Sequence, residues 1–144
     1  MRYFIASRWE NMKQVQYLTE NLHSLGHEIF SYVSDSRNFV SQKELAQPKE
    51  SFAQGDNWRT RPALKGIFEH DMGGLTGCDT FVLLLPAGES SHIQAGIAYA
   101  LGKHTVLIGE PAQTKSHYLI FSEWHKSIEE YITALRQGAT TTHA

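Results

Sequence analysis

The sequence predicts a single α/β domain with a doubly wound, five-stranded parallel sheet of flavodoxin-like or Rossmann-like order. Short apolar runs alternate along the chain with segments whose apolar side chains recur at helical spacing. Residues 80–85 are apolar almost without interruption, which is typical of a strand buried on both faces in the middle of a parallel sheet. The length of 144 residues suits one domain with its own core.

The N-terminal segment predicts one strand–helix–strand unit. Residues 3–6 form a short apolar run, and apolar side chains then recur every three or four positions between residues 10 and 25. Gly26 follows at a position where the end of a helix favours glycine. Residues 27–32 are the second predicted strand, so this unit places two parallel strands side by side.

Residues 33–62 lack a clear periodicity and predict either a binding loop or a solvated insertion with a short helix near residues 41–45. The loop contains Phe39, Phe52 and Trp58, which are unfavourable in contact with water. We therefore favour the binding loop.

The remaining chain predicts three helices and three strands. The predicted helices are residues 63–75, a segment after the turn at 86–91 with Ile93, Ile97, Ala98 and Leu101 on one face, and a last helix capped by Ser122 with Trp124 in the core. The predicted strands are residues 80–85, 105–108 and, more weakly, 118–121. Residues 1–137 then form the domain and residues 138–144 a flexible C-terminal tail.

Composition excludes several classes of protein. The 13 Lys and Arg against 15 Asp and Glu leave a net charge of −2, with no basic excess for nucleic acid. The lone Cys78 cannot form an intramolecular disulfide, and the eight histidines show no metal-ligand spacing. No apolar stretch is long enough for a membrane span or a signal peptide. We therefore predict a cytoplasmic protein with no metal, no cofactor, no nucleic-acid partner and no membrane partner.

Residues 86–96 carry the strongest local signal for ligand binding. Doubly wound sheets bind ligands beyond the carboxyl ends of their strands, which points to the loops 7–10, 33–62, 86–91 and 109–116. Backbone amides at the helix start after residue 88 favour an anion, and Ser90 and Ser91 would add hydroxyl donors. Equally, Ser90 could simply cap the helix and Gly88 could form the turn. The segment matches neither a dinucleotide fingerprint nor a Walker motif.

Several motifs taken in order resemble the nucleoside 2-deoxyribosyltransferase family, including its nucleoside 5′-monophosphate N-glycosidase relatives. They are YFIASRWEN at 3–11, GHEI at 26–29, Asp71, CD at 78–79, LPAGESSHIQAG at 85–96 and GK at 102–103. The resemblance extends from Tyr3 to about Ile108 and implies the flavodoxin-like fold. It also implies cleavage of the bond between a base and a (deoxy)ribose through a glycosyl-enzyme ester, as in a retaining glycosidase.

The resemblance also implies a set of site residues. Gln94 lies at the nucleophile position, Asp71 matches the aspartate associated with the leaving base, and Tyr3 matches the tyrosine that orients the nucleophile. The predicted substrate-binding residues are Ser7, Trp9, Gly88, Ser90, Ser91 and His92. A homodimer or higher homo-oligomer is implied, in which the 109–116 loop of a partner, with Ser116, completes the pocket around a nucleoside or nucleotide.

Two residues depart from the family pattern. Glu89 stands where close relatives often carry arginine, and its charge would weaken phosphate binding. Gln94 is a neutral amide, and the expected loss of rate without a carboxylate is on the order of 10⁴- to 10⁶-fold. Gln94 is therefore either an engineered replacement of a glutamate, which we favour because the swap is nearly isosteric, or a native residue in a non-catalytic nucleotide-binding or sensor protein. A flavin-binding protein is a third alternative.

Overall fold

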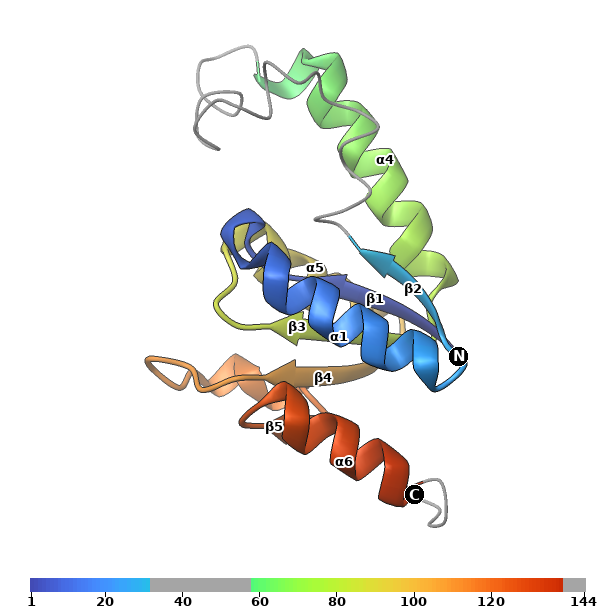
Figure 1. The fold of residues 1–144 in the computed structure, drawn as a ribbon. Coiled ribbons are helices and arrows are strands. Elements are labelled where there is room, and N and C mark those ends of the chain that lie inside the picture. The colour runs from blue at the N-terminus through green and yellow to red at the C-terminus, as the bar shows by residue number, and fades with distance from the viewer. Residues whose placement is uncertain (32–57, 139–144) are drawn as a thin grey trace.

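A computed structural model describes residues 1–31 and 58–138. Within these residues the chain forms one parallel sheet of five strands in the order β2-β1-β3-β4-β5 (Figure 1). The strands are β1 (Arg2–Ala6), β2 (Glu28–Ser31), β3 (Thr80–Leu84), β4 (His104–Ile108) and β5 (Glu123–His125). This order is that of flavodoxin-like sheets and confirms the predicted fold class. Of the predicted loop 33–62, residues 33–57 with the short helix lie outside the described residues, as do residues 139–144 of the predicted tail 138–144.

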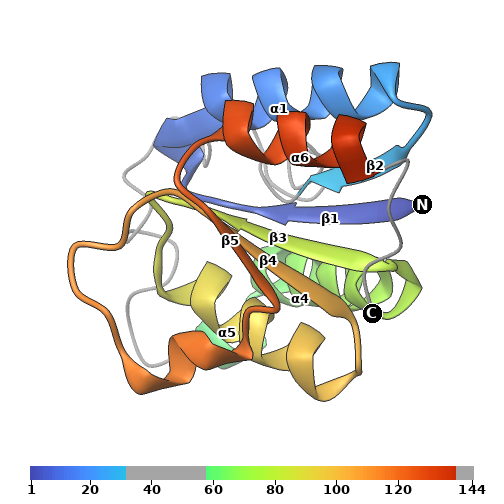
Figure 2. The same cartoon turned by 90° about the horizontal axis from the view of Figure 1, so that it is seen from below.

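Helices cover both faces of the sheet (Figure 2). Helices α1 (Met12–Ser24) and α6 (Ile128–Gly138) lie on one face, and α4 (Pro62–Gly77) and α5 (Glu89–Ala100) lie on the other. Short 3₁₀ helices occupy Trp9–Asn11 (η1), Trp58–Thr60 (η4) and Ser116–Ile120 (η5). Figure 1 shows that the N-terminal half of α4 extends beyond the sheet, so α4 and α5 separate there.

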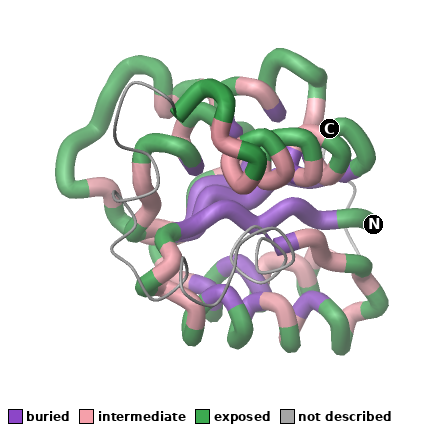
Figure 3. Tube along the Cα trace, turned by 90° about the horizontal axis from the view of Figure 1, so that it is seen from above, coloured by how far each residue is buried: buried purple, intermediate pink, exposed green. Residues whose placement is uncertain are grey.

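The central strands form the core, as the tube coloured by burial shows (Figure 3). All five residues of β3 are buried, which confirms that its unbroken apolar run belongs to an interior strand. Gly26 and Gly102, which follow α1 and α5, have φ angles of +88° and +76°. Side chains with a Cβ rarely adopt these angles, so glycine ends both helices, as the sequence predicts for Gly26. None of the helices in residues 1–31 and 58–138 has the length and hydropathy needed to cross a bilayer.

The predicted fifth strand is wrong. Residues 118–121 fall in and just after η5, and the edge strand β5 follows at Glu123–His125. The hydroxyl of Thr105 in β4 donates to the Ile120 carbonyl at 2.6 Å, and the backbone N–H of Ser122 donates to the Thr105 carbonyl at 2.9 Å. These bonds tie the 3₁₀ turn to the start of β4, so strand pairing begins only afterwards.

The predicted start of the last helix is also wrong. Helix α6 begins at Ile128, and the Ser127 hydroxyl accepts a hydrogen bond from the backbone N–H of Glu130 at 3.1 Å, which makes Ser127 the cap. Trp124 lies in β5 with 54% of its surface exposed, and its indole N–H donates to the Gly109 carbonyl at 2.7 Å. Trp124 therefore holds an edge loop rather than filling the core.

Helix α5 packs on the sheet with only part of the predicted face, since Ala98 is buried and Ile97 packs against the core. Its buried residues are Ser91, Gln94, Ala95 and Ala98. Ile93 and Leu101, which the sequence places on the same helix face, are 65% and 47% exposed. Small side chains allow the helix to lie close to β3 and β4, whereas the side chains of Ile93, Tyr99 and Leu101 are exposed.

Candidate active site

Asp71 of α4 and Gln94 of α5 meet between the two helices. The Gln94 Nε2 group donates a hydrogen bond to Asp71 Oδ2 at 3.1 Å, and the residues are only 8% and 5% exposed. A carboxylate only accepts hydrogen bonds, so this contact determines which end of the amide faces Asp71. The structure thus joins two predicted catalytic residues that lie 23 positions apart.

A cavity of about 540 Å³ opens over this pair, within the usual size range of small-molecule sites. Asp71, Gln94 and Ser90 are polar residues of its wall, and Arg59 and Lys65 are the cationic ones. The rest of the lining is apolar and comprises Trp58, Leu64, Ile67, Phe68, Met72, Leu75, Ile93 and Ile97. Such a wall favours a ligand with a flat apolar part and a few polar groups.

Tyr3 does not join this pair. Its hydroxyl shares a 2.8 Å hydrogen bond with the Tyr131 hydroxyl of α6, and its ring lies 5.2 Å from that of His27. Both contacts place the Tyr3 side chain on the face of the sheet covered by α1 and α6 (Figure 2), opposite the face that carries Gln94. Burial raises the pKa of Tyr3. The contacts of Tyr3 with Tyr131 and His27 therefore give no support to its predicted role in orienting residue 94.

Ser7 and Ser91 join two loops instead of facing the cavity. The Ser7 hydroxyl donates to the Leu84 carbonyl at 2.8 Å and accepts from the Asn11 side-chain amide at 2.9 Å. The Ser91 hydroxyl donates to the Ser7 carbonyl at 3.2 Å. Both serines are at most 1% exposed. Their hydrogen bonds hold the loop after β1 against the loop after β3, and this use leaves neither hydroxyl at the surface for a substrate.

Of the other predicted binding residues, Gly88, His92 and Trp9 make contacts within the protein, and Ser90 lines the cavity. His92 Nδ1 donates to the Gly88 carbonyl at 2.8 Å, and His92 Nε2 shares a hydrogen bond of 3.1 Å with the Tyr118 hydroxyl. Trp9 of η1 packs against the core. Among the predicted substrate-binding residues, only Ser90 lines the cavity over Asp71 and Gln94.

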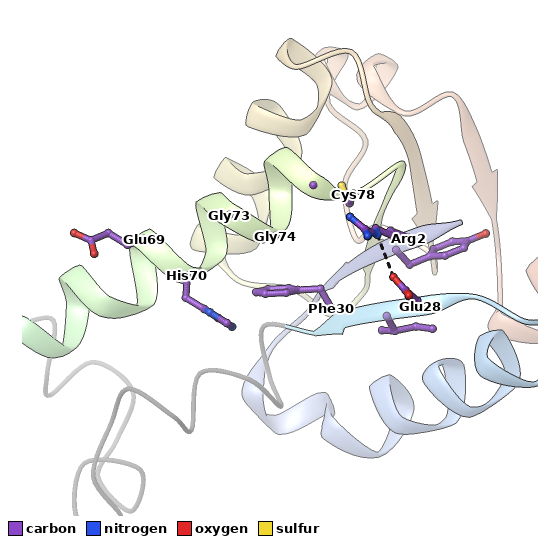
Figure 4. Close-up of a pocket in the computed structure, with 11 residues that line it drawn as sticks. Arg2, Glu28, Phe30, Glu69, His70, Gly73, Gly74 and Cys78 are labelled. Carbon is purple, nitrogen blue, oxygen red and sulfur yellow. Dashed lines mark hydrogen bonds and ion pairs between the residues drawn. The ribbon is translucent and has the colours of Figure 1, made fainter.

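A second cavity of about 480 Å³ lies between α4 and the β1–β2 edge (Figure 4). An ion pair of 3.0 Å between Arg2 and Glu28 borders it, and the Phe30 ring lies so close to Gly74 that a Cβ there would come within 2.8 Å. His70 faces this cavity, with its ring 4.7 Å from that of Phe30. Consecutive residues point about 100° apart around a helix, so His70 and Asp71 face different cavities and form no catalytic pair.

The described residues contain no group of three or more metal-ligating side chains placed to hold a metal ion. Cys78 is buried, as expected of a small apolar residue, and burial raises the pKa of its thiol. The chemistry available at the cavity therefore comes from Asp71, Gln94, Ser90 and the cationic residues at its rim.

No protein-family model matches the chain, and no curated protein matches it in sequence. Solved structures do match. The CMP N-glycosidase of Clostridium botulinum aligns with a TM-score of 0.60 at 17% identity, over 94% of this chain and 99% of that one. The 2-deoxyribosyltransferase of Bacillus psychrosaccharolyticus aligns with a TM-score of 0.63 at 17% identity, over 92% and 90%. A conserved protein from Enterococcus faecalis V583 gives 0.60 at 16%, over 95% and 98%.

The chain has the same fold as these three solved structures. The resemblance in the sequence motifs therefore extends to the arrangement of the whole domain. At this level of identity the likeness concerns the fold alone, so the chemistry must be argued from the side chains at the cavity.

Residue 94 decides what the site can do. Its amide is uncharged and a poor nucleophile, and among the described residues its Oε1 atom has no hydrogen-bond partner. A carboxylate at this position would lie close to the Asp71 carboxylate. Like charges at such a distance cannot both ionise readily, so the two groups would titrate as a coupled pair. The uncharged Gln94 amide causes no such repulsion and instead donates a hydrogen bond to Asp71.

Sequence reasoning found Trp58 and Ser90 of the cavity wall but missed the wall residues of α4 and the cationic residues. Phe68 lies within the helix predicted over residues 63–75 and is 63% exposed, and Arg59 and Lys65 were not singled out. One signal was present, because Leu64, Phe68 and Met72 recur every four residues beside a second apolar row at Ile67 and Leu75. Two apolar rows are more than one sheet contact needs, which indicates a further apolar contact on α4.

Proposed function

We propose that the cavity between α4 and α5 binds a (deoxy)nucleoside or a nucleoside 5′-monophosphate, with the sugar over Gln94 and the base beside Asp71. The observation that carries this proposal is the hydrogen bond between Asp71 and Gln94 in the wall of a cavity of about 540 Å³. The apolar side chains of Trp58, Phe68 and Ile93 line the same cavity and suit the flat face of a base. The shared fold with an N-glycosidase and a 2-deoxyribosyltransferase supports this choice of ligand.

A glutamate at position 94 would supply the nucleophile that Gln94 lacks. Its carboxylate oxygen would bond to C1′ of the sugar while the C1′–N bond breaks, and the electron pair of that bond would leave with the base. We assign the proton transfer to Asp71, which in its protonated form would give its proton to the leaving base and become a carboxylate. Water would then release the sugar in a hydrolase, or a second base would take it in a transferase. The chain with Gln94 has no such nucleophile, and we propose that this form holds its ligand intact.

A second candidate is a non-catalytic nucleotide-binding or sensor protein with Gln94 as its native residue. The hydrogen bond from the amide to Asp71 favours it, because the amide supplies a donor that an ionised carboxylate at position 94 would lack. Both candidates predict ligand binding by the protein as it stands. They differ in what happens when a carboxylate is introduced.

The test is the Gln94→Glu variant, incubated with a panel of nucleosides and 5′-monophosphates and analysed for free base by chromatography. The enzyme proposal expects base release that exceeds that of the unchanged protein by at least about 10⁴-fold. Gln94→Leu is the matched control, since it fills similar space and carries no carboxylate. No release from any panel member, despite ligand binding by calorimetry, would leave the sensor as the function. Absence of binding to the whole panel would contradict both candidates.

We also propose that the protein acts in the cytoplasm as a homodimer or higher homo-oligomer, with Ser116 of a partner near the pocket. Large apolar side chains that are about half or more exposed support association; they include Trp58, Phe68, Ile93 and Tyr99. Sedimentation equilibrium would show a mass above the 16.3 kDa of one chain.

A further inference from the structure

The two residues of the cavity pair are held by different parts of the sheet. Gln94 belongs to α5, which packs over β3 and β4. Asp71 belongs to α4, and three residues after it Gly74 meets the Phe30 side chain, which reaches from β2 toward the helix (Figure 4). The 3.1 Å hydrogen bond between Gln94 and Asp71 therefore depends on how closely α4 approaches β2.

Gly74 is the point of closest approach between α4 and β2. A Cβ at this position would lie 2.8 Å from Cδ1 and Cε1 of Phe30 and 2.9 Å from Cδ2. Carbon atoms in favourable contact are about 3.5–4.0 Å apart, so any other residue at 74 would have to stand roughly 1 Å further from the ring. Glycine destabilises a helix interior relative to alanine. The close approach is therefore the physical reason for glycine at position 74.

The Phe30 ring has little room to retreat from α4. It stacks on the ring of Phe4 with centroids 4.8 Å apart, and Phe4 stacks on Phe81 with centroids 5.6 Å apart. Phe4 and Phe81 are both 0% exposed, so this row of rings runs into the closely packed core. The ring of His70 lies 4.7 Å from that of Phe30 as well. A methyl group added at residue 74 would therefore displace α4 rather than the ring.

We propose that Gly74 and Phe30 are positioning residues for the cavity between α4 and α5. Their contact sets the distance of α4 from β2 and so keeps Asp71 within hydrogen-bond distance of Gln94. Neither residue lines this cavity, so both act through α4. The hydrogen bond can be followed in the protein without ligand. The consequence for ligand binding rests on the proposed function, and a displacement of about 1 Å can cost on the order of a hundredfold.

The test compares three glycine-to-alanine changes in the same helix. Gly74→Ala adds a methyl group against Phe30, whereas Gly73→Ala and Gly77→Ala are matched controls, because a Cβ at either position would meet nothing within 4 Å. All three gain helix propensity alike. The readout is the side-chain amide signal of Gln94 in ¹H–¹⁵N spectra, identified as the signal that Gln94→Leu lacks.

We expect Gly74→Ala to move the Gln94 signal toward that of a free amide, because the hydrogen bond to Asp71 lengthens. Phe30→Leu tests the contact from β2: it removes the ring that supports α4 and should also move the signal. Combined with Gly74→Ala it makes room for the methyl group, so the double variant should return the signal toward its original position. Gly73→Ala and Gly77→Ala should leave it in place.

Calorimetry with the nucleosides and 5′-monophosphates then measures the effect on binding. We expect Gly74→Ala to raise the dissociation constant about tenfold to a hundredfold, and the double variant with Phe30→Leu to recover most of this loss. An unmoved Gln94 signal in both single variants would overturn the positioning role, as would equal shifts in Gly73→Ala or a double variant without recovery. A signal that moves as expected, in a protein that binds no panel member, would overturn the proposed function and leave the positioning role standing.

Discussion

At the scale of single residues, the hydrogen bond between Tyr3 and Tyr131 shows how one contact can reassign a side chain. The two hydroxyls lie 2.8 Å apart and both residues are 1% exposed. Burial raises the pKa of Tyr131 far above its ordinary value, so both groups remain neutral and either can donate. The pair links β1 to α6, which gives Tyr3 a role in stability and none at the cavity.

We therefore expect Tyr3→Phe and Tyr131→Phe each to lower the free energy of unfolding by about 1–3 kcal/mol, because each leaves a buried hydroxyl without its partner. The double variant should lose clearly less than the sum of the two, since no orphaned hydroxyl remains. Urea denaturation measures all three, and Tyr99→Phe is the control because Tyr99 is 56% exposed. Strictly additive losses, or a change in ligand affinity in Tyr3→Phe, would contradict this role.

At the scale of elements, the start of α6 shows that a local signal can be present and still be assigned to the wrong residue. The residues Ser127 and Glu130 have the serine–glutamate spacing of a capping box. The Ser127 hydroxyl accepts from the Glu130 N–H at 3.1 Å, and the Glu130 carboxylate accepts from the Lys126 N–H at 2.8 Å. Ser122 was expected as the cap, but β5 separates it from the helix.

Replacing Ser127 by alanine should lower the free energy of unfolding by about 0.5–2 kcal/mol, because the first turn of α6 loses a hydrogen-bond acceptor. The matched Ser122→Ala variant should change it by less than about 0.5 kcal/mol. Urea denaturation followed by circular dichroism compares the two directly. Equal losses would mean that the hydroxyl of Ser127 does not stabilise the helix.

At the scale of the whole molecule, the Glu123 side chain links the short edge strand β5 to its neighbour β4. One carboxylate oxygen accepts from His104 of β4, and the other accepts from His125 of β5 at 3.0 Å. Burial raises the pKa of Glu123, but the hydrogen bonds from His125 and His104 outweigh it and hold the pKa below its ordinary value. The ionised form is thus favoured in the folded protein.

This shift makes stability depend on pH in a defined direction. A carboxyl with a lowered folded pKa contributes stability above its unfolded pKa, and that contribution disappears as the pH falls through the folded value. We expect Glu123→Gln to be less stable than the unchanged protein at pH 7 and the gap to close below about pH 4. Thermal unfolding from about pH 7 to pH 3 measures the gap, and a constant gap would exclude this linkage. High salt should narrow it, because the three side chains are partly exposed.

Sequence by itself determined the fold class, the central strands and the two residues of the cavity pair. Unbroken apolar runs, helical spacing and the glycines at 26 and 102 are local patterns. Each can be read from neighbouring residues and predicts a strand, a helix or a helix end. Asp71 and Gln94 were found through motifs that resemble a known family. The short edge strand was not found, since a three-residue strand half in water needs no distinctive pattern.

Only the tertiary structure decided which side of each element faces the site. Adjacent residues of a strand point to opposite faces, so the place of Tyr3 depended on which helices cover each face. The burial of Ser7 and Ser91 depended in the same way on the meeting of two loops that are distant in sequence. The cavity, with Lys65 and Arg59 at one end and Asp71 within it, arises because α4 and α5 separate beyond the sheet. Such a separation is a property of packing between distant elements, which no local pattern records.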